Sequence, residues 1–330
     1  MFNVSNSEKN INKEIPWTEK YRPQYLKDIV GQEKITNTVK KLFETKNLPH
    51  LLFYGPPGTG KTSTILSIAR DLYGRELMKE RVIELNASQE RGIKVVRNKI
   101  NSFASNEVCK NENVPPYKII ILDEADTITH DAQTALRRSM EINSEITRFC
   151  IICNYITNII DPITSRCCFY RFDTIKEEKF TNRLQFICEQ EKVSYDLKAL
   201  KFIYNISDGD LRNGIHLLQY CSSFNNNKIS EENLLFFSGY IDNNYINNIL
   251  INIENYNYFQ IKKIVKELLQ NGYSSENIIR SLLKNLKKNK NISEIKKADI
   301  AIIIAESEKK ISNGSSEYLN LLNIFFHFIC

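Results

Sequence analysis

The chain has 330 residues, 42% of them hydrophobic and 25% charged, so it is long enough for two or three domains and too apolar to be disordered throughout. Its net charge of +6 permits a nucleic-acid partner without requiring one. No apolar run approaches the roughly 20 residues that a membrane span needs. The polar start at residues 1–12 resembles no signal peptide, so we expect no membrane partner. Eight cysteines are too few for a disulfide scaffold.

Residues 1–14 are expected to form a flexible tail, after which short apolar runs alternate with helix-length segments. The runs are 51–54, 82–85, 119–122, 149–153 and 169–172. The run at 119–122 is continuously apolar, as expected of a strand buried on both faces of a parallel sheet. Strand–helix alternation predicts an α/β domain whose parallel sheet is covered by helices on both sides. Cys150 and Cys153 would then point to opposite faces of one strand, which excludes a shared zinc ion.

A phosphate-binding loop lies between the first of these runs and a predicted helix at 63–73. Residues 55–62, Gly-Pro-Pro-Gly-Thr-Gly-Lys-Thr, fit the pattern G-x-x-x-x-G-K-[ST] in the strand–loop–helix context that it requires. Glycines let backbone N–H groups turn toward phosphates, and the helix N-terminus adds positive potential. We therefore predict that Lys61 reaches the β- and γ-phosphates of ATP and that Thr62 ligates Mg²⁺. The predicted nucleotide-binding residues of this segment are Gly55, Pro56, Pro57, Gly58, Thr59, Gly60, Lys61, Thr62 and Ser63.

Polar residues follow the next two central runs. Asp123 and Glu124 come directly after 119–122, and Asn154 follows 149–153. Ligands bind beyond the carboxyl ends of strands in an open parallel sheet, so Asp123 is expected to hold Mg²⁺ and Glu124 to activate the attacking water. An acidic helix N-terminus would explain the acids but not their position after a buried strand. Asn154 fits either a hydrogen bond to the γ-phosphate or ordinary turn chemistry.

Two arginines leave alternatives open on the residues alone. Arg166 precedes the last run and fits either a local ion pair or a phosphate contact in a neighbouring subunit. Arg212 falls in the first turn of a helix that Asp210 would cap, where a cation is disfavoured unless an anion such as a phosphate lies nearby.

After residue 173 the pattern becomes helical. Thr174 and Glu177 predict a capping box that opens a helix ending near residue 191. Two further helices are predicted at 196–207 and 210–223, and apolar periodicity continues beyond residue 238. We therefore expect an α/β domain at 15–173, a small helical lid at 174–238 and an all-α collar at 239–330.

Residues 16–222 resemble the small subunits of replication factor C, the eukaryotic clamp loader of the AAA+ class of P-loop NTPases. The matching segments are 16–23, 47–64, 84–88, 90–93, 123–126, 135–141, 147–155, 160–167 and 209–213. The resemblance implies that Asn154 is the sensor-1 residue, Arg212 the sensor-2 residue, and Arg166 an arginine finger that acts on ATP in the adjacent subunit. It also implies that Thr18 and Arg22, in the N-terminal box at 16–23, line the nucleotide site.

The resemblance further implies a nuclear hetero-pentamer with other replication factor C subunits. Its ATP binding and hydrolysis would load a sliding clamp, proliferating cell nuclear antigen, onto primer–template DNA in replication and repair. Arg91, Lys94 and Arg97 lie in a basic amphipathic segment that the family uses to follow DNA phosphates, although a solvated helix face explains them as well. Gln89 departs from the acid that the family usually has there, and we expect a local effect only.

Two other functions compete with this interpretation. Residues 123–126, Asp-Glu-Ala-Asp, also suggest a helicase, but a two-lobed helicase needs a second α/β domain, and residues 174–330 are predicted to be helical. A scaffold or checkpoint adaptor would bind ATP without hydrolysing it, and the presence of both Glu124 and Asn154 argues against that.

Overall fold

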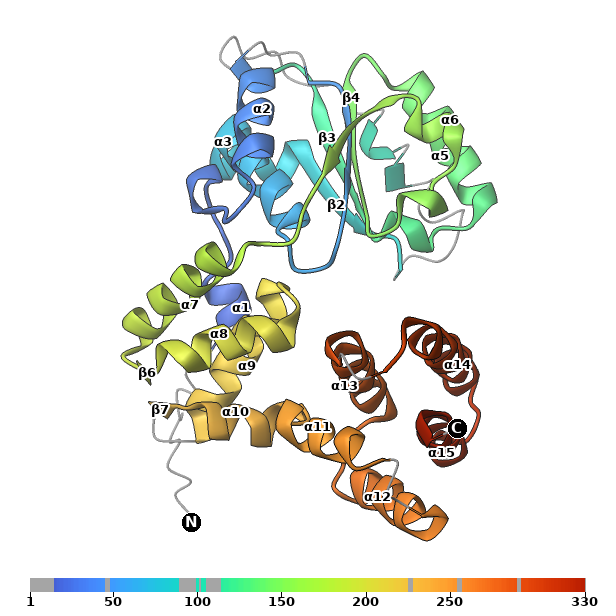
Figure 1. Ribbon diagram of the computed structural model, residues 1–330. Helices are drawn as coiled ribbons and strands as arrows, with labels where there is room; N and C mark the ends of the chain where they lie inside the picture. Colours follow the sequence, from blue (N-terminus) through green and yellow to red (C-terminus); the bar gives the residue numbers. More distant parts are fainter. Residues whose placement is uncertain are drawn as a thin grey trace, which may run out of the picture. The chain divides into compact units, whose positions relative to one another are not determined.

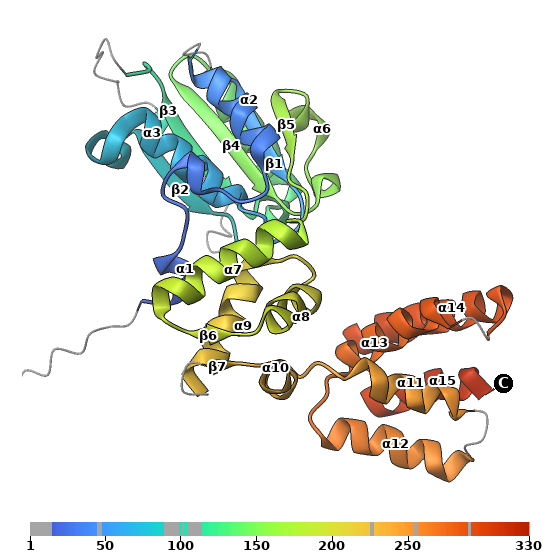
Figure 2. The ribbon, with the colours of Figure 1, turned by 60° about the vertical axis from the view of Figure 1, so that its left-hand side comes forward.

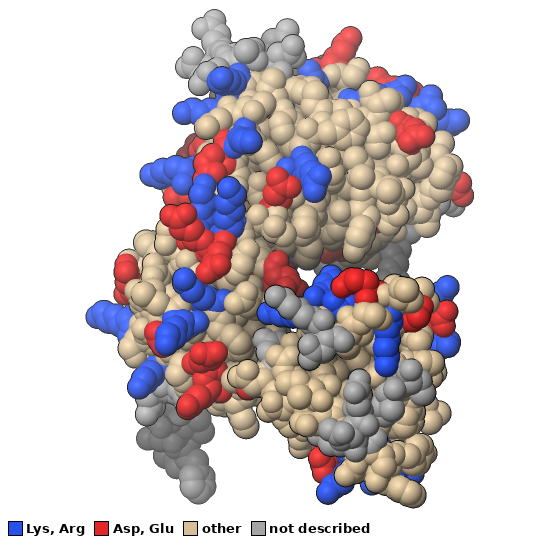
Figure 3. Space-filling view, viewed as in Figure 1, with Lys and Arg blue, Asp and Glu red and all other residues tan. Residues whose placement is uncertain are grey.

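The computed structural model describes residues 15–44, 48–88, 99–100, 102–104, 114–224, 228–253, 257–289 and 292–329. The chain forms two compact units, Met1–Gln219 and Tyr220–Cys330. Among the described residues, no helix is long and apolar enough to cross a membrane. Acidic and basic side chains are interspersed on the face shown in Figure 3, so the charge of +6 is not gathered into one patch among the described residues of that face.

A five-stranded parallel sheet organises the first unit, as the alternating pattern predicts. Its strand order is β2-β3-β4-β1-β5. In register, Tyr54 lies beside Cys153 and Leu122 beside Ile151, so the carboxyl ends of the central strands meet at one edge of the sheet. The strands are β1 (His50–Tyr54), β2 (Val82–Asn86), β3 (Lys118–Asp123), β4 (Thr147–Cys153) and β5 (Cys167–Arg171).

Helices cover both faces of this sheet (Figures 1 and 2). On one face, α2 (Glu33–Glu44) and α3 (Lys61–Arg81) pack over a cluster that includes Ile119, Ile121 and Cys150. On the other, α5 (His130–Ile142) and α6 (Asp161–Thr164) pack over Ile120, Leu122 and Cys153. The two cysteines therefore belong to opposite faces, because side chains alternate along a strand.

Short elements connect these layers and lead into them. The N-terminal box contains α1 (Trp17–Lys20), and η1 (Leu26–Asp28) follows it and packs against α3. Two 3₁₀ turns, η2 (Ala125–Thr127) and η3 (Ile156–Asn158), follow β3 and β4. The helix predicted at 63–73 is longer than expected, because α3 begins at Lys61 and continues to Arg81 across a kink at Gly74.

The remaining helices of the first unit lie in the range predicted to be the lid, and we call them the lid below. They are α7 (Glu177–Glu191), α8 (Leu197–Ser207) and the start of α9 (Leu211–Phe224), with a short strand β6 (Ser194–Tyr195) between α7 and α8. Asp196 caps α8, accepting a hydrogen bond from the Lys198 N–H at 3.1 Å. The predicted capping box at Thr174 is wrong, because the chain stays extended until Lys176, which is the N-cap of α7 and makes no side-chain cap bond.

The second unit is helical around a single apolar cluster that includes Ile261, Val265, Leu282 and Phe325. Asn257, Ser274 and Ser293 each cap a helix by accepting a backbone N–H bond. Its elements are β7 (Lys228–Ile229), α10 (Glu231–Ser238), α11 (Asn243–Ile251), α12 (Tyr258–Gln270), α13 (Ser275–Lys288), α14 (Glu294–Ser312) and α15 (Glu317–Ile329). The division into domains at residues 173 and 238 stays a prediction.

Candidate functional site

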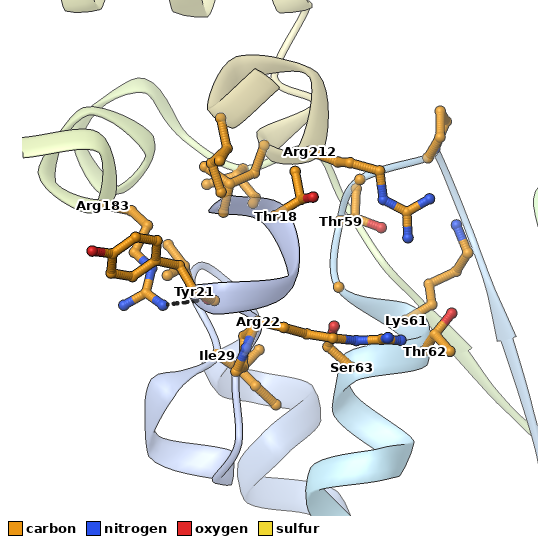
Figure 4. Close-up of a pocket in the computed structure, with 18 of the residues that line it drawn as sticks. Thr18, Tyr21, Arg22, Ile29, Thr59, Lys61, Thr62, Ser63, Arg183 and Arg212 are labelled. Atoms are coloured by element: carbon orange, nitrogen blue, oxygen red, sulfur yellow. Dashed lines mark hydrogen bonds between the residues drawn. The ribbon is translucent and has the colours of Figure 1, made fainter. Parts of the chain in front are cut away.

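A cavity of about 250 Å³ opens at the carboxyl edge of the sheet. The N-terminal box, the phosphate-binding loop, the ends of β3 and β4, and the lid all line it (Figure 4). The predicted site residues that line it are Thr18, Arg22, Pro57, Gly58, Thr59, Gly60, Lys61, Thr62, Ser63, Asp123, Glu124, Asn154 and Arg212. Segments that are far apart in the sequence therefore line one cavity.

The loop at residues 55–62 holds Lys61 at the base of this cavity. The Lys61 ammonium donates to the Gly55 carbonyl at 2.7 Å, the Pro56 carbonyl at 2.8 Å and the Asn154 amide oxygen at 3.0 Å. Burial lowers the pKa of Lys61, and the nearby Asp123 carboxylate opposes that shift. Gly55 is required by close packing, since a Cβ there would lie 2.2 Å from the Phe172 carbonyl oxygen. Pro56 and Gly55 thus hold the lysine through their carbonyls.

The ends of β3 and β4 bring oxygen ligands to the same place. The Thr62 hydroxyl donates to Asp123 Oδ2 at 2.7 Å, and Asp123 Oδ1 accepts the Glu124 N–H at 2.9 Å. A hydroxyl and a carboxylate side by side are the hard oxygen donors that suit Mg²⁺. Glu124, which also lines the cavity, is exposed and adopts a left-handed backbone (φ 54°) directly after β3.

Asp126 is a residue of this edge to which sequence reasoning assigned no role. Its Oδ2 accepts the Asn154 N–H at 3.0 Å and the Tyr155 N–H at 3.2 Å. These bonds fix the chain just beyond β4, and with it the amide that contacts Lys61. In the sequence, the only indication of this role was the place of Asp126 in the acidic segment 123–126.

The lid supplies the opposite wall. Arg212 lies in the first turn of α9 and extends toward Thr59 and Lys61 in Figure 4. Asp210 caps this helix as predicted, accepting the Asn213 N–H at 3.0 Å. The Asp210 carboxylate also lies directly against Gly58, where a Cβ would be 1.8 Å from Oδ1. An arginine in a first helical turn is unfavourable for the helix dipole, and here it faces an anion-binding loop.

The N-terminal box lines the cavity with Thr18 and Arg22. The Arg22 side chain reaches across the cavity toward Thr62 and Ser63 (Figure 4). Sequence reasoning missed an apolar end of the cavity, because isolated aliphatic residues carry no motif. The aliphatic lining residues are Ile29, Val30, Ile175, Leu211 and Ile215, and Arg183 of α7 also lines the cavity.

Comparison with known proteins decides the family. Residues 51–174 match the ATPase family associated with various cellular activities (AAA), and residues 241–327 match the replication factor C C-terminal domain. The chain is 43% identical to replication factor C subunit 2 of Saccharomyces cerevisiae, over 94% of this chain and 91% of the relative. The chain belongs to the replication factor C family. Subunit 4 of Arabidopsis thaliana is 43% identical over 96% and 95% of the two chains, and subunit 4 of Homo sapiens 40% identical over 97% and 89%.

Solved structures agree on the fold. The Thermotoga maritima RuvB Holliday junction branch migration motor superposes with a TM-score of 0.51 at 17% identity, covering 76% of this chain and 79% of that one. This confirms the α/β P-loop fold with a helical remainder. The chain is thus an ATPase subunit of the replication factor C clamp loader, which binds nucleotide through its AAA domain, as the sequence resemblance implies.

Arg166 of this replication factor C chain does not line the cavity among the described residues. It follows α6, with a side chain that is 37% exposed, and donates to Glu141 Oε1 and to the Pro162 carbonyl, both at 2.6 Å. Glu141 also accepts Arg137 Nε at 3.0 Å. Arg166 is therefore held by its own subunit at a place other than its own nucleotide pocket.

Three predicted DNA contacts, Arg91, Lys94 and Arg97, lie outside the described residues, as does Gln89. Among the residues that the structure describes, no group of three or more His, Cys, Asp or Glu side chains could hold a metal ion.

Proposed function

We propose that this subunit binds ATP in the cavity at the sheet edge and hydrolyses it within a hetero-oligomer. The observation that carries the proposal is the convergence of Lys61, Thr62, Asp123 and Asn154, which hydrogen bonds of 2.7–3.0 Å join in two pairs. The Lys61 ammonium now bonded to carbonyls and to Asn154 is the cation that would turn to the β- and γ-phosphates. Burial strengthens that attraction, because fewer water dipoles screen it.

Thr62 and Asp123 would hold Mg²⁺, which would supply charge neutralisation at the phosphates. Glu124 would accept a proton from the attacking water, since its carboxylate is exposed at the cavity and its own N–H is tied to Asp123. Asn154 would orient that water or the γ-phosphate through its amide, while Asp126 keeps the backbone at Asn154 fixed.

The apolar end of the cavity would take the adenine base, because the phosphates must lie at the loop. Thr18 and Arg22 would enclose the nucleotide from the N-terminal box, and Arg212 would contact phosphate from the lid. Residues 15–173 would act as the ATPase domain, 174–238 as the lid and 239–330 as the collar that joins subunits.

Arg166 would complete the site of an adjacent subunit. Its exposed side chain and its position away from its own cavity favour this role. We expect Arg166→Ala to slow hydrolysis at the neighbouring site about a thousandfold while ATP binding here is unchanged. Arg171→Ala, an exposed arginine on β5, is the matched control and should have no such effect. Unchanged turnover at the neighbouring site would contradict the role in trans.

The complex would be a nuclear hetero-pentamer of replication factor C subunits that opens a sliding clamp, proliferating cell nuclear antigen, and places it on primer–template DNA in replication and repair. Family membership and the mild positive charge support this assignment. Arg91, Lys94 and Arg97 would follow the DNA phosphates.

ATP binding by the assembled complex tests the proposed function. In a complex whose other subunits carry a substituted phosphate-binding lysine, we expect Lys61→Ala to weaken ATP binding about 10- to 100-fold, the cost of a lost charge-assisted bond. Lys79→Ala removes an exposed lysine from the same helix and should leave binding intact. Equal ATP affinity in the Lys61→Ala and unsubstituted complexes would refute the assignment.

A further inference from the structure

The helix of the N-terminal box is bound to the lid. The Trp17 N–H donates to Gln219 Oε1 of α9 at 3.0 Å. The backbone between this helix and the sheet domain then runs through Pro23, whose carbonyl accepts the Ser67 hydroxyl of α3 at 3.4 Å. The box is therefore fastened at one end to the lid and at the other to the ATPase core, and the nucleotide cavity lies beside the stretch between them.

One carboxylate of the lid accepts two bonds from the box. Glu191 Oε1 accepts the Lys20 ammonium at 2.6 Å and the Tyr21 hydroxyl at 2.5 Å. These bonds lower the pKa of Glu191 although its partial burial opposes the shift, and burial together with the same carboxylate raises the pKa of Tyr21. The Glu191 side chain is only 18% exposed.

The position of Glu191 is unfavourable for α7 when that helix is considered alone. Glu191 is the last residue of that helix, where the dipole disfavours an anion, and the last turn of α7 contains no basic residue. Lys20 and Tyr21 of the box supply the compensation that the helix itself lacks. Glu191 is unfavourable for its own helix, and its partners lie about 170 positions earlier in the chain. This combination indicates that Glu191 serves the contact between the lid and the box and not the stability of α7.

A second lid residue holds the box from the other side. Arg183 Nη2 donates to the Tyr21 carbonyl at 2.8 Å (Figure 4). The Arg183 guanidinium also lies 5.1 Å from the ring centroid of Phe186. The Tyr21 carbonyl belongs to the peptide group that precedes Arg22, the residue that reaches across the cavity. Arg183 and Glu191 thus fix the backbone and side chain of the residue next to Arg22, which is predicted to line the nucleotide site.

We propose that Arg183 and Glu191 are positioning residues for the nucleotide, which hold the N-terminal box against the lid. By fixing Tyr21, they set the place from which Arg22, the next residue, enters the cavity opposite Arg212 of the lid. This inference rests on the proposed ATP site. In this inference, Arg183, which lines the cavity, and Glu191 both affect how tightly the site binds ATP.

A double-mutant cycle across the box and the lid tests the inference. The protein is the full complex in which the other subunits carry a substituted phosphate-binding lysine, and the probe is ATP. We expect Tyr21→Phe and Glu191→Ala each to weaken ATP binding about three- to tenfold, the range for an ordinary protein hydrogen bond. The double variant should be no weaker than Glu191→Ala, since Glu191→Ala already breaks the contact that Tyr21→Phe removes.

Controls separate positioning from loss of structure. Glu177→Ala removes a carboxylate from the other end of α7, where it pairs with Lys201, and should leave ATP affinity unchanged. Glu191→Gln keeps an acceptor for the Tyr21 hydroxyl and should restore part of the affinity. The loss should appear in ATP affinity more than in turnover at saturating ATP, because the lost interaction stabilises bound ATP and its transition state alike.

The outcomes are distinct. Additive losses in the double variant, or ATP affinity unchanged by Glu191→Ala and Arg183→Met, would overturn the inference while leaving the ATP site intact. An equal loss with Glu177→Ala would assign the effect to general damage to α7 and would overturn it as well. If Lys61→Ala in the same complex binds ATP normally, the proposed function itself fails.

Discussion

Replacing Gly58 by alanine inserts a methyl group between the phosphate-binding loop and the lid. Gly58 has φ +67°, and the added Cβ would lie 1.8 Å from Oδ1 and 2.3 Å from Cγ of Asp210. Real carbon atoms do not approach this closely, so the Asp210 carboxylate must move. When it moves, α9 loses the 3.0 Å cap bond that the Asn213 N–H donates to it.

The expected loss in the free energy of unfolding is the sum of two costs. A left-handed backbone costs an alanine about 1 kcal/mol, and loss of a helix N-cap costs about 1 kcal/mol more. Gly60→Ala is the matched control, because Gly60 also has a positive φ (+93°) but no atom within 4 Å of the added Cβ. We therefore expect Gly58→Ala to lower the free energy of unfolding by about 2 kcal/mol and Gly60→Ala by about 1 kcal/mol.

Trp17 provides the assay, because it is the chain's single tryptophan and its N–H bonds to the lid residue Gln219. Urea unfolding followed by its fluorescence reports the first unit. Asp210→Ser shortens the side chain but keeps a capping oxygen. In the Gly58→Ala background it should restore about 1 kcal/mol of the free energy of unfolding, whereas in the unsubstituted chain it should lower that free energy by less than about 1 kcal/mol. Equal destabilisation by the two glycine variants, with no recovery by Asp210→Ser, would refute the reasoning.

Three further predictions follow from particular contacts. Gly214→Ala places a Cβ 2.4 Å from Phe180 Cζ, so we expect a loss of about 1–3 kcal/mol of stability, measured by the same urea titration, and a smaller loss would show that α7 and α9 separate easily. Burial lowers the pKa of His50 to about 4 from 6.5. Between these pH values the folded state therefore binds fewer protons than the unfolded state. The free energy of unfolding should be unaffected by His50 above pH 6.5 and should fall by roughly 3 kcal/mol as the pH drops to 4. Replacing His50 by Asn should flatten that part of the pH profile, and an unchanged profile would contradict the prediction that His50 causes the loss of stability. Glu141→Gln removes the ion pair that holds Arg166, and because both groups are more than a third exposed we expect only about a two- to fivefold slower hydrolysis at the neighbouring site, with ATP binding there unchanged.

The sequence by itself determined the α/β domain and the centre of its site. Each of the five apolar runs became a strand of the parallel sheet. In the three central strands β1, β3 and β4 the reason is burial on both faces, which demands nearly continuous apolar residues. The glycine-rich loop and the residues after β3 and β4 could be predicted because their positions depend on local chain geometry. Parallel strands then bring Lys61, Asp123 and Asn154 to one edge without further information.

Local reasoning failed where a contact depends on tertiary packing. Thr174 and Glu177 have the spacing of a capping box, yet the chain stays extended to Lys176 as it leaves the sheet domain, so no cap forms. The partners of Arg166 were also undetermined, since an exposed arginine before a strand has no pattern that selects Glu141.

The attachment of the N-terminal box to the lid was decided only by the tertiary structure. Arg183 and Glu191 belong to an ordinary helical pattern, and their partners Tyr21 and Lys20 lie more than 160 positions earlier. Hydrophobic periodicity specifies which face of α7 is buried, but not which segment meets its polar end. The closeness of Asp210 to Gly58 has the same origin, because side-chain contacts between elements arise from packing rather than from any one segment of the chain.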